Sequence, residues 1–436
     1  MAACSAEPRG TRMGPSNLKK NQRLDLSRRE FIHQASLASL GATGMGAHLA
    51  RAAAAPPHPD HSQGTVAEPA GMKDLPSGGK PIKLFCCDFN WVRLDKPIFG
   101  TPPAAPQDWA FVDPKEYFDW HVNFGVNVMF CQAYAFGGYA FYPTRLGAVA
   151  PGPGSELFPK LFKMARKARL PFHAYFCTAA DLTMSNMRPA WVVPTSNKPG
   201  SAGFLAPESP WTDLLCARVD EFLRHYPVDW LVFDWFVYGS LHPNDFAVQP
   251  AWFVKGPFKE IIGRDMPDDA AKISPEESLQ YKRAVLAKQF HRIQETVHKA
   301  SPETRIYFNV PYRKPAEALW VDHPMLNESD MLLAESSDDV VPWLLKIRKP
   351  HQRVMTTVVG RQDGVSDPNT WKKWFEAGCD FFGYAWGTPP DFRPHPAYAA
   401  AVEIVRQAYH QMPGGGRWGP KQHRLEAGKS AREVGP

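Results

Sequence analysis

Motifs that would identify a metal or redox centre are missing from this sequence of 436 residues. It has no Cys-x-x-Cys pair, no His-x-His and no His-Glu-x-x-His, which are spacings typical of metal and redox sites. It also lacks Gly-x-Ser-x-Gly, the turn that presents a nucleophilic serine in many hydrolases. No Gly-x-Gly-x-x-Gly, the dinucleotide-binding fingerprint, follows a predicted strand. We therefore expect neither a metal nor an organic cofactor.

The seven cysteines are best interpreted as core residues. Cys4 lies in the N-terminal leader, and most of the others fall inside predicted strands, where a thiol behaves as a small apolar residue. These others are Cys86, Cys87, Cys131, Cys177, Cys216 and Cys379. We expect them to be mainly buried free thiols, with a single disulfide as the alternative.

No run of about 20 strongly apolar residues is present, so we expect no membrane span. The N-terminal segment has the features of an export signal instead. Leu26-Ser-Arg-Arg-Glu-Phe-Ile32 resembles the twin-arginine pattern, an Ala- and Gly-rich stretch follows, and Ala-x-Ala cleavage choices lie before Ala55. We predict a signal peptide over residues 1–55, recognition by the twin-arginine export machinery, and a periplasmic or secreted protein. A disordered basic leader is the alternative.

Positive charge is concentrated at the two ends of the chain. Residues 1–55 hold eight Lys/Arg against three Asp/Glu, and residues 412–436 hold five against two, within a formal charge of +6 for the whole chain. The region between is slightly acidic, which argues against a nucleic-acid partner because phosphate binding needs clustered cations. The Pro- and Gly-rich stretch over 56–80 and the tail over 412–436 are predicted to be disordered.

From Ile82 onward, apolar runs alternate with helical patterns. Eight short apolar runs predict strands at 83–89, 126–131, 171–177, 229–235, 304–310, 330–335, 353–359 and 379–386. One helix is predicted to begin after Asp113, with Pro114 in its first turn, and to end at Gly125. A short helix is weakly indicated near 314–320, and the others are predicted near 156–168, 208–225, 275–300, 338–348, 367–377 and 397–410.

This alternation predicts parallel strand pairing and a (β/α)8 TIM barrel over residues 81–411, which would form a single catalytic domain. An open doubly wound sheet is the main alternative, although no Gly-x-Gly-x-x-Gly follows a predicted strand, which weakens a nucleotide-binding version of it. Two long insertions follow the second and fourth strands, at about 132–155 and about 236–274. In a barrel, such insertions lie on the catalytic face.

Two carboxylates stand at the carboxyl ends of predicted strands, where a barrel places its catalytic groups. Asp234 lies in the apolar run Asp229-Trp-Leu-Val-Phe-Asp-Trp-Phe236, and Glu335 ends the sixth strand. Because an unpaired buried carboxylate is costly, each is either paired as a structural group or faces a substrate. Two such groups suit glycoside hydrolysis, in which one is nucleophile or base and the other donates a proton. For Glu335, a role in capping a helix is an equal alternative.

Further candidates for substrate binding lie near the same strand ends. Asp88, Tyr175 and Asn309 could form hydrogen bonds to a ligand. Aromatic side chains could stack on the flat faces of a sugar, or could simply pack the core. The aromatic candidates are Trp91, Tyr139, Tyr142, Trp235 and Trp386.

Two segments carry a resemblance to a known family. Gly137-Gly-Tyr-Ala-Phe-Tyr-Pro-Thr144 resembles the Gly-(Phe/Tyr)-Ala-x-(Tyr/Trp)-Pro-(Ser/Thr) loop of the α-L-fucosidase superfamily, and is closer to related barrel proteins labelled hypothetical glycosyl hydrolases. Val232-Phe-Asp-Trp235 is similar to the Trp-Phe-Asp motif of that family. The resemblance covers roughly residues 82–240. The His-His-Asp that fucosidases place before the loop is absent, since Ala135-Phe136-Gly137 stands there, which puts fucose specificity in doubt.

The resemblance implies a barrel glycoside hydrolase of the retaining type, with Asp234 as its nucleophile. Glu335 is the candidate acid/base from its position and chemistry alone. The expected partner is an oligosaccharide or polysaccharide, with no cofactor required. A non-catalytic saccharide-binding barrel and a metal-dependent hydrolase of another class are the two alternatives.

Overall fold

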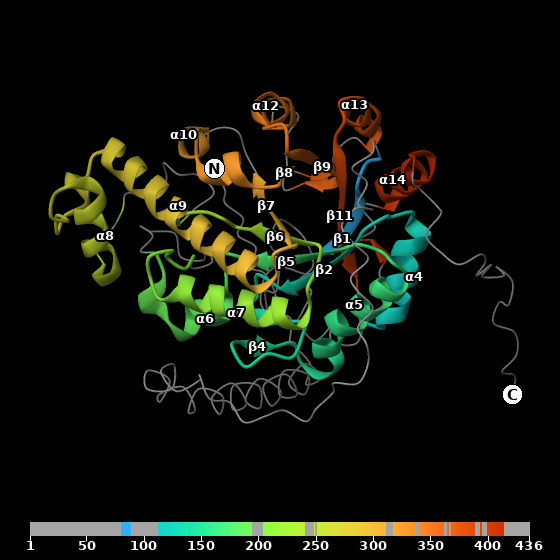
Figure 1. Ribbon diagram of the computed structural model, residues 1–436, viewed down its shortest axis with the longest axis horizontal. Helices are drawn as coiled ribbons and strands as arrows, with labels where there is room; N and C mark the ends of the chain where they lie inside the picture. The colour runs from blue at the N-terminus through green and yellow to red at the C-terminus, as the bar shows by residue number, and fades with distance from the viewer. Residues whose placement is uncertain are drawn as a thin grey trace, which may run out of the picture. The chain divides into compact units, whose positions relative to one another are not determined.

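Eight parallel strands and the helices between them form the frame of the computed structural model (Figure 1). The strands are β1 (Lys83–Asp88), β2 (Met129–Tyr134), β5 (Phe172–Cys177), β6 (Trp230–Asp234), β7 (Arg305–Val310), β8 (Met331–Ala334), β9 (Arg353–Arg361) and β11 (Asp380–Thr388). The structure describes residues 80–88, 112–193, 204–239, 248, 251–310, 317–335, 340–361, 364–365, 368–388, 393–394 and 399–413. The predicted signal peptide and nearly all of the predicted linker and tail lie outside these residues.

The predicted helices are confirmed to within a few residues. They are α4 (Pro114–Phe124), α5 (Leu157–Lys167), α7 (Trp211–His225), α9 (Pro275–Ala300), α10 (Glu317–Trp320), α12 (Val340–Ile347), α13 (Trp371–Glu376) and α14 (Ala399–Gln411). Local chemistry sets their ends. Asp113 accepts hydrogen bonds from the first-turn amides of α4, and Gly125 ends that helix at a φ of 93°. Ser274 and Glu277 form a capping box at the start of α9.

The two insertions contain short elements that the sequence pattern did not indicate individually. The first carries β3 (Tyr139–Ala140) and β4 (Ala148–Val149), and the second carries α8 (Trp252–Ile262). The second insertion also contains the 3-10 helix η5 (Ala270–Lys272), and η3 (Gly152–Glu156) lies at the end of the first. Elsewhere the described chain adds α6 (Leu182–Met187), α11 (Pro324–Glu328), β10 (Gly364–Val365) and β12 (Arg393–Pro394), and the short 3-10 helices η4 (Pro189–Trp191) and η6 (Pro368–Thr370).

The strand order follows the chain without reversal. Hydrogen-bonded neighbours run β1-β11-β9-β8-β7-β6-β5-β2, and every pair among these eight is parallel. This progressive order excludes the doubly wound alternative, in which the order reverses at a switch point. The described residues show no backbone ladder between β1 and β2, however, so the sheet is not closed and the predicted TIM barrel is not confirmed.

Side chains connect β1 and β2 where a ladder would close the sheet. The Asn127 Oδ1 atom accepts from the backbone amide of Lys83 at 2.7 Å, and its Nδ2 atom donates to the Pro81 carbonyl at 2.9 Å. Asn127 also donates its own amide to the Lys83 carbonyl. Asn127 thus precedes β2, which begins at Met129, later than the predicted residue 126.

Alternate residues of the strands build two separate cores. Leu84, Val232 and Met355 belong to an inner cluster on the concave face of the sheet, whereas Phe85, Phe233 and Val354 belong to a larger cluster between strands and helices. A strand directs successive side chains to opposite faces, so a sheet with an inner core of its own must be strongly curved. Figure 1 shows the helices outside this sheet. The curved sheet brings all eight carboxyl ends toward one place.

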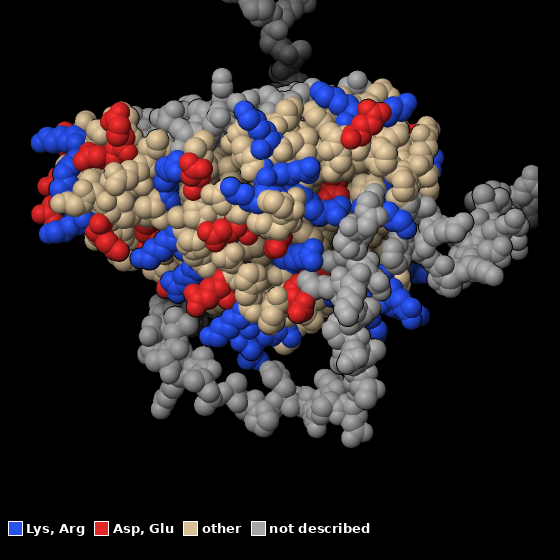
Figure 2. Space-filling view, turned by 45° about the horizontal axis from the view of Figure 1, so that its top comes forward, with Lys and Arg blue, Asp and Glu red and all other residues tan. Residues whose placement is uncertain are grey.

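The surface shows no large region of one charge on the face drawn in Figure 2, where acidic and basic side chains are interspersed. Among the described residues, no helix is both long and apolar enough to cross a membrane.

Candidate active site

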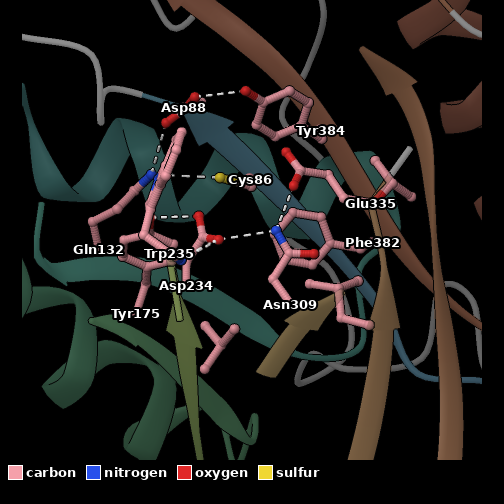
Figure 3. Close-up of a pocket in the computed structure, with 13 residues that line it drawn as sticks. Cys86, Asp88, Gln132, Tyr175, Asp234, Trp235, Asn309, Glu335, Phe382 and Tyr384 are labelled. Carbon is pink, nitrogen blue, oxygen red and sulfur yellow. Dashed lines mark hydrogen bonds between the residues drawn. The ribbon is translucent and has the colours of Figure 1, made fainter. Parts of the chain in front are cut away.

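A pocket lies at the carboxyl ends of the parallel strands, and each of the eight contributes to it (Figure 3). Both predicted catalytic residues line this pocket, together with Asp88, Tyr175, Trp235 and Asn309 from the predicted binding residues. Its other described lining residues are Cys86, Gln132, Val232, Leu333, Thr357, Phe382 and Tyr384. Residues that are far apart in the sequence therefore meet at one site, because each lies at or near the carboxyl end of a parallel strand.

Asp234 is held by three donors. Its Oδ2 atom accepts from the Tyr175 hydroxyl at 2.7 Å, and its Oδ1 atom accepts from Asn309 Nδ2 at 2.9 Å and from the Trp235 backbone amide at 2.7 Å. Burial raises the pKa of Asp234, while these three hydrogen bonds favour the ionised form and lower it. The carboxylate is therefore fixed in orientation, with its pKa above the ordinary value for aspartate.

The backbone directly after β6 is arranged to make one of these bonds. Trp235 has a φ of 55°, a left-handed conformation that is rare for a bulky residue. This turn directs the Trp235 amide back to the carboxylate of Asp234. Thr178, directly after the neighbouring strand β5, fixes the turn, because the Asp234 carbonyl accepts from the Thr178 amide at 2.8 Å and from the Thr178 hydroxyl at 2.6 Å. Strained backbone held this way is common at functional sites.

Glu335 lies directly after β8 and shares a donor with Asp234. The Nδ2 atom of Asn309, on the intervening strand β7, donates to both carboxylates. The two N–O distances are 2.9 and 2.5 Å, so the two carboxylate oxygens lie at most 5.4 Å apart. The carboxylates therefore face the same space, as Figure 3 shows.

A third carboxylate, Asp88, lies at the end of β1. Its Oδ2 atom accepts from the Tyr384 hydroxyl at 2.7 Å, and its Oδ1 atom accepts from Gln132 Nε2 at 3.4 Å. Burial raises the pKa of Tyr384 well above its ordinary value, and the charges of Asp88 and Glu335 raise it further. Tyr384 therefore stays protonated and acts as a donor in this corner of the pocket.

The aromatic candidates do not all reach the pocket. Trp235 lines it and packs against Phe136 at a ring-centroid distance of 5.2 Å. Tyr142 is fully buried in the core between the strands and α7, in contact with Phe222, and Tyr139 on β3 is likewise absent from the lining. Trp91 lies outside the described residues, and Trp386 is placed in β11 by its backbone alone.

The resemblance loop from Gly137 to Thr144 is anchored by a buried ion pair. Arg218 on α7 donates to Asp181 at 2.8 Å, and both side chains are almost completely buried. The Arg218 guanidinium lies 4.3 Å from the centre of the Tyr134 ring and donates to the Leu146 carbonyl. Gly138 approaches Asp181 so closely that a Cβ atom there would lie 2.1 Å from the carboxylate. This loop has a structural role next to the pocket.

The sequence analysis missed several residues that line the pocket. Some of them had a recognisable sequence pattern and others had none. Gln132 is a buried polar residue inside an apolar strand, the same signal that identified Asp234, but the predicted strand ended before it. Thr357 lies in a β-branched run that is typical of any strand, so nothing in the sequence distinguished it. Among the described residues, no group of three or more His, Cys, Asp or Glu side chains is arranged to hold a metal ion.

Solved structures that resemble this chain include α-L-fucosidases. Isoenzyme 2 of α-L-fucosidase from Paenibacillus thiaminolyticus matches with a TM-score of 0.55 at 16% identity, over 76% of this chain and 49% of that chain. The unliganded α-L-fucosidase AlfC from Lactobacillus casei matches with a TM-score of 0.42 at 13% identity, over 69% of this chain and 80% of that chain. The Thermotoga maritima α-fucosidase in complex with fucose gives 0.38 and 13%, over 69% and 57%.

These comparisons show the fold alone. The chain spans about half the length of the Paenibacillus enzyme, and it shares with that enzyme an α/β architecture built on a mostly parallel sheet. No protein-family model and no curated protein sequence matches the chain. The resemblance seen in the two sequence motifs is thus supported at the level of the fold.

Proposed function

We propose that this protein is a glycoside hydrolase. The observation that carries the proposal is the pair of carboxylates, Asp234 and Glu335, which face one pocket and accept from the same amide. Glycosidases use two carboxylates that flank the scissile bond. The fold shared with the Paenibacillus thiaminolyticus fucosidase is consistent with this chemistry.

The spacing of the two groups favours a retaining mechanism. Carboxyl groups lie about 5–5.5 Å apart in retaining glycosidases and about 6.5–9.5 Å apart in inverting ones. The nearest oxygens here lie within 5.4 Å, which leaves little room for the water that an inverting enzyme places between base and sugar. Asp234 is the better nucleophile of the two, because three donors fix its orientation.

The reaction would then proceed in two displacements. Asp234 attacks the anomeric carbon and forms a glycosyl ester, while Glu335 protonates the departing oxygen. In the second step Glu335 takes a proton from water, the water oxygen attacks the anomeric carbon, and the ester bond to Asp234 breaks. Asn309 holds both carboxylates throughout, and Tyr175 stabilises Asp234 when it leaves as a carboxylate.

Chemical rescue of a nucleophile variant tests this proposal sharply. Purified protein is screened on aryl glycosides of the common hexoses, pentoses and deoxyhexoses, with Asp234→Gly alongside. We expect the variant to lose at least a thousandfold in kcat/KM, within the range for covalent catalysis. Added azide should restore turnover and give a glycosyl azide of inverted configuration.

The matched control is Asp181→Asn, which alters a buried aspartate that does not line the pocket. Its turnover on a folded sample should exceed that of Asp234→Gly by orders of magnitude. Wild-type turnover that is unchanged in Asp234→Gly would overturn the assignment of the nucleophile. Saturable sugar binding with no turnover on any glycoside would favour the saccharide-binding alternative.

A further inference from the structure

Three buried polar atoms of the pocket have no hydrogen-bond partner within the part of the chain that the structure describes. They are Oε1 of Gln132, Oδ1 of Asn309 and Oγ1 of Thr357. The three residues are 1, 8 and 8% exposed, and all of them line the pocket. Buried polar atoms in folded proteins are almost always hydrogen-bonded. The three atoms are therefore positions that the hydroxyl groups of a ligand can occupy, with water in their place when no ligand is bound.

The side-chain amide and phenol donors of Gln132, Asn309, Tyr175 and Tyr384 are already used. Gln132 Nε2 donates to Asp88 and to the sulfur of Cys86, and Asn309 Nδ2 donates to two carboxylates. The hydroxyls of Tyr175 and Tyr384 each donate to a carboxylate as well. The unpartnered atoms are two amide oxygens and one hydroxyl, and the carboxylates of the lining are further acceptors, so a ligand that fits must bring donors of its own.

The charge of the pocket also favours a ligand that donates hydrogen bonds and carries no negative charge. Three carboxylates, those of Asp88, Asp234 and Glu335, line the pocket, and its described lining holds no Lys, Arg or His. An anionic ligand would meet like charges in a partly dehydrated space, where repulsion is strong. A neutral ligand rich in hydroxyl groups can instead donate hydrogen bonds to the carboxylates and to the unpartnered amide oxygens.

We propose that the pocket selects an uncharged sugar residue whose free hydroxyls donate to Gln132 and Asn309 and pair with Thr357, and that it excludes uronic acids and sulfated or phosphorylated sugars. This inference rests on the proposed function for the identity of the ligand as a sugar. It adds which side chains recognise the sugar bound next to Asp234, and that this sugar is uncharged.

The first test is calorimetric titration of the wild-type protein at pH 7. The probes are glucose, galactose, mannose, xylose and fucose, against glucuronic and galacturonic acids. We expect the tightest neutral sugar to bind at least about tenfold more tightly than either acid, a difference typical of one lost interaction. Equal or tighter binding of an acid would overturn the proposal, as would the failure of every neutral sugar to bind.

The second test uses a nearly isosteric variant. Thr357→Val removes the unpartnered hydroxyl, so the Tm should stay unchanged or rise, while binding of the same neutral sugar weakens about tenfold. The control is Thr356→Val, because Thr356 is similarly buried but belongs to the opposite face of β9. A hydroxyl needed only for structure would lower the Tm and leave the affinity unchanged, which would overturn the role of Thr357.

Failure of this proposal can be told apart from failure of the proposed function. If the protein binds neutral sugars selectively but hydrolyses no glycoside, the roles given to Gln132, Asn309 and Thr357 in sugar binding are supported and the proposed glycosidase activity is refuted. If hydrolysis requires Asp234 but is faster on uronides than on neutral glycosides, the proposed glycosidase activity is supported and the proposed selection of uncharged sugars is refuted.

Discussion

Asp234 and Glu335 accept hydrogen bonds from a single atom, Nδ2 of Asn309. Asp234 and Asn309 lie on the neighbouring parallel strands β6 and β7, and Glu335 directly follows the next strand, β8. A donor on the middle strand therefore sets the spacing of two carboxylates on either side of it. This arrangement depends on the register of the three strands.

Replacing the shared donor should disable the pair without removing either carboxylate. We expect Asn309→Ala to lower kcat by about 100-fold, because loss of one preorganised donor typically costs 10²–10³. Steady-state kinetics on the best glycoside from the screen measures this, and circular dichroism checks the fold. Asn127→Ala is the control for loss of a buried amide away from the pocket. A loss of less than about threefold in kcat would contradict the role given to Asn309.

The pH dependence of the reaction should report the hydrogen bond from Tyr175. The pKa of Asp234 is raised by burial and lowered by its donors, the Tyr175 hydroxyl first among them. A nucleophile must be ionised, so kcat/KM should rise with pH through this pKa. Tyr175→Phe removes a hydrogen bond that lowers the pKa of Asp234. The acidic limb of the kcat/KM profile should therefore move to higher pH. A profile with an unchanged or more acidic limb would show that the bond does not control ionisation.

Periodicity and strand-end position carried most of what the sequence predicted. Regular alternation of apolar runs located all eight strands, because each run is buried on both faces and bounded by a helix. The rule that catalytic groups end barrel strands then selected Asp234, Asn309 and Glu335 together. These predictions needed only the chain order and the parallel topology.

What the sequence could not predict depends on contacts between distant strands. Tyr142 belongs to the loop motif that carried the resemblance, yet its ring packs against Phe222 of α7 in the outer core. Gln132 and Asp88 meet only because the curved sheet brings β1 and β2 together without a ladder. Closure of the sheet is a matter of cumulative twist over eight strands, which no local pattern encodes.

Two glycines offer a matched test of the loop beside the pocket. Gly138 and Gly152 both have positive φ, at 83° and 58°, but only Gly138 has atoms within the reach of a new Cβ, the nearest being Asp181 Oδ1. We expect Gly152→Ala to cost about 1–2 kcal/mol, the usual penalty for the left-handed region. Gly138→Ala should cost several kcal/mol more, because the Asp181–Arg218 pair must move and a broken buried pair costs about 3–5 kcal/mol. Urea unfolding of both variants measures the difference, and equal losses would show that the ion pair tolerates displacement.

Lys83 should make stability depend on pH in the alkaline range. It is fully buried, its Nζ atom donates to the Tyr409 carbonyl at 2.6 Å, and burial lowers its pKa from 10.5 to about 8. Below about pH 8 both the folded and the unfolded states carry the proton, so the folded state bears the full cost of the buried charge. As the pH rises from about 8 toward 10.5, the folded state releases the proton first, and the contribution of Lys83 to stability should increase.

The measurement compares the wild type with Lys83→Met, which keeps the length of the side chain and removes its charge. The Tm of the wild type minus that of the variant should rise between pH 7 and pH 10 (about the range set by the two pKa values), whatever its sign at neutral pH. Taking the difference between the two Tm values cancels the effect on stability of all other titrating groups, because both proteins contain them. Lys160→Met, a change at an exposed position on α5, is the control. A difference that stays constant or falls with pH would mean that Lys83 keeps its proton in the folded protein, stabilised by the carbonyl at the end of α14.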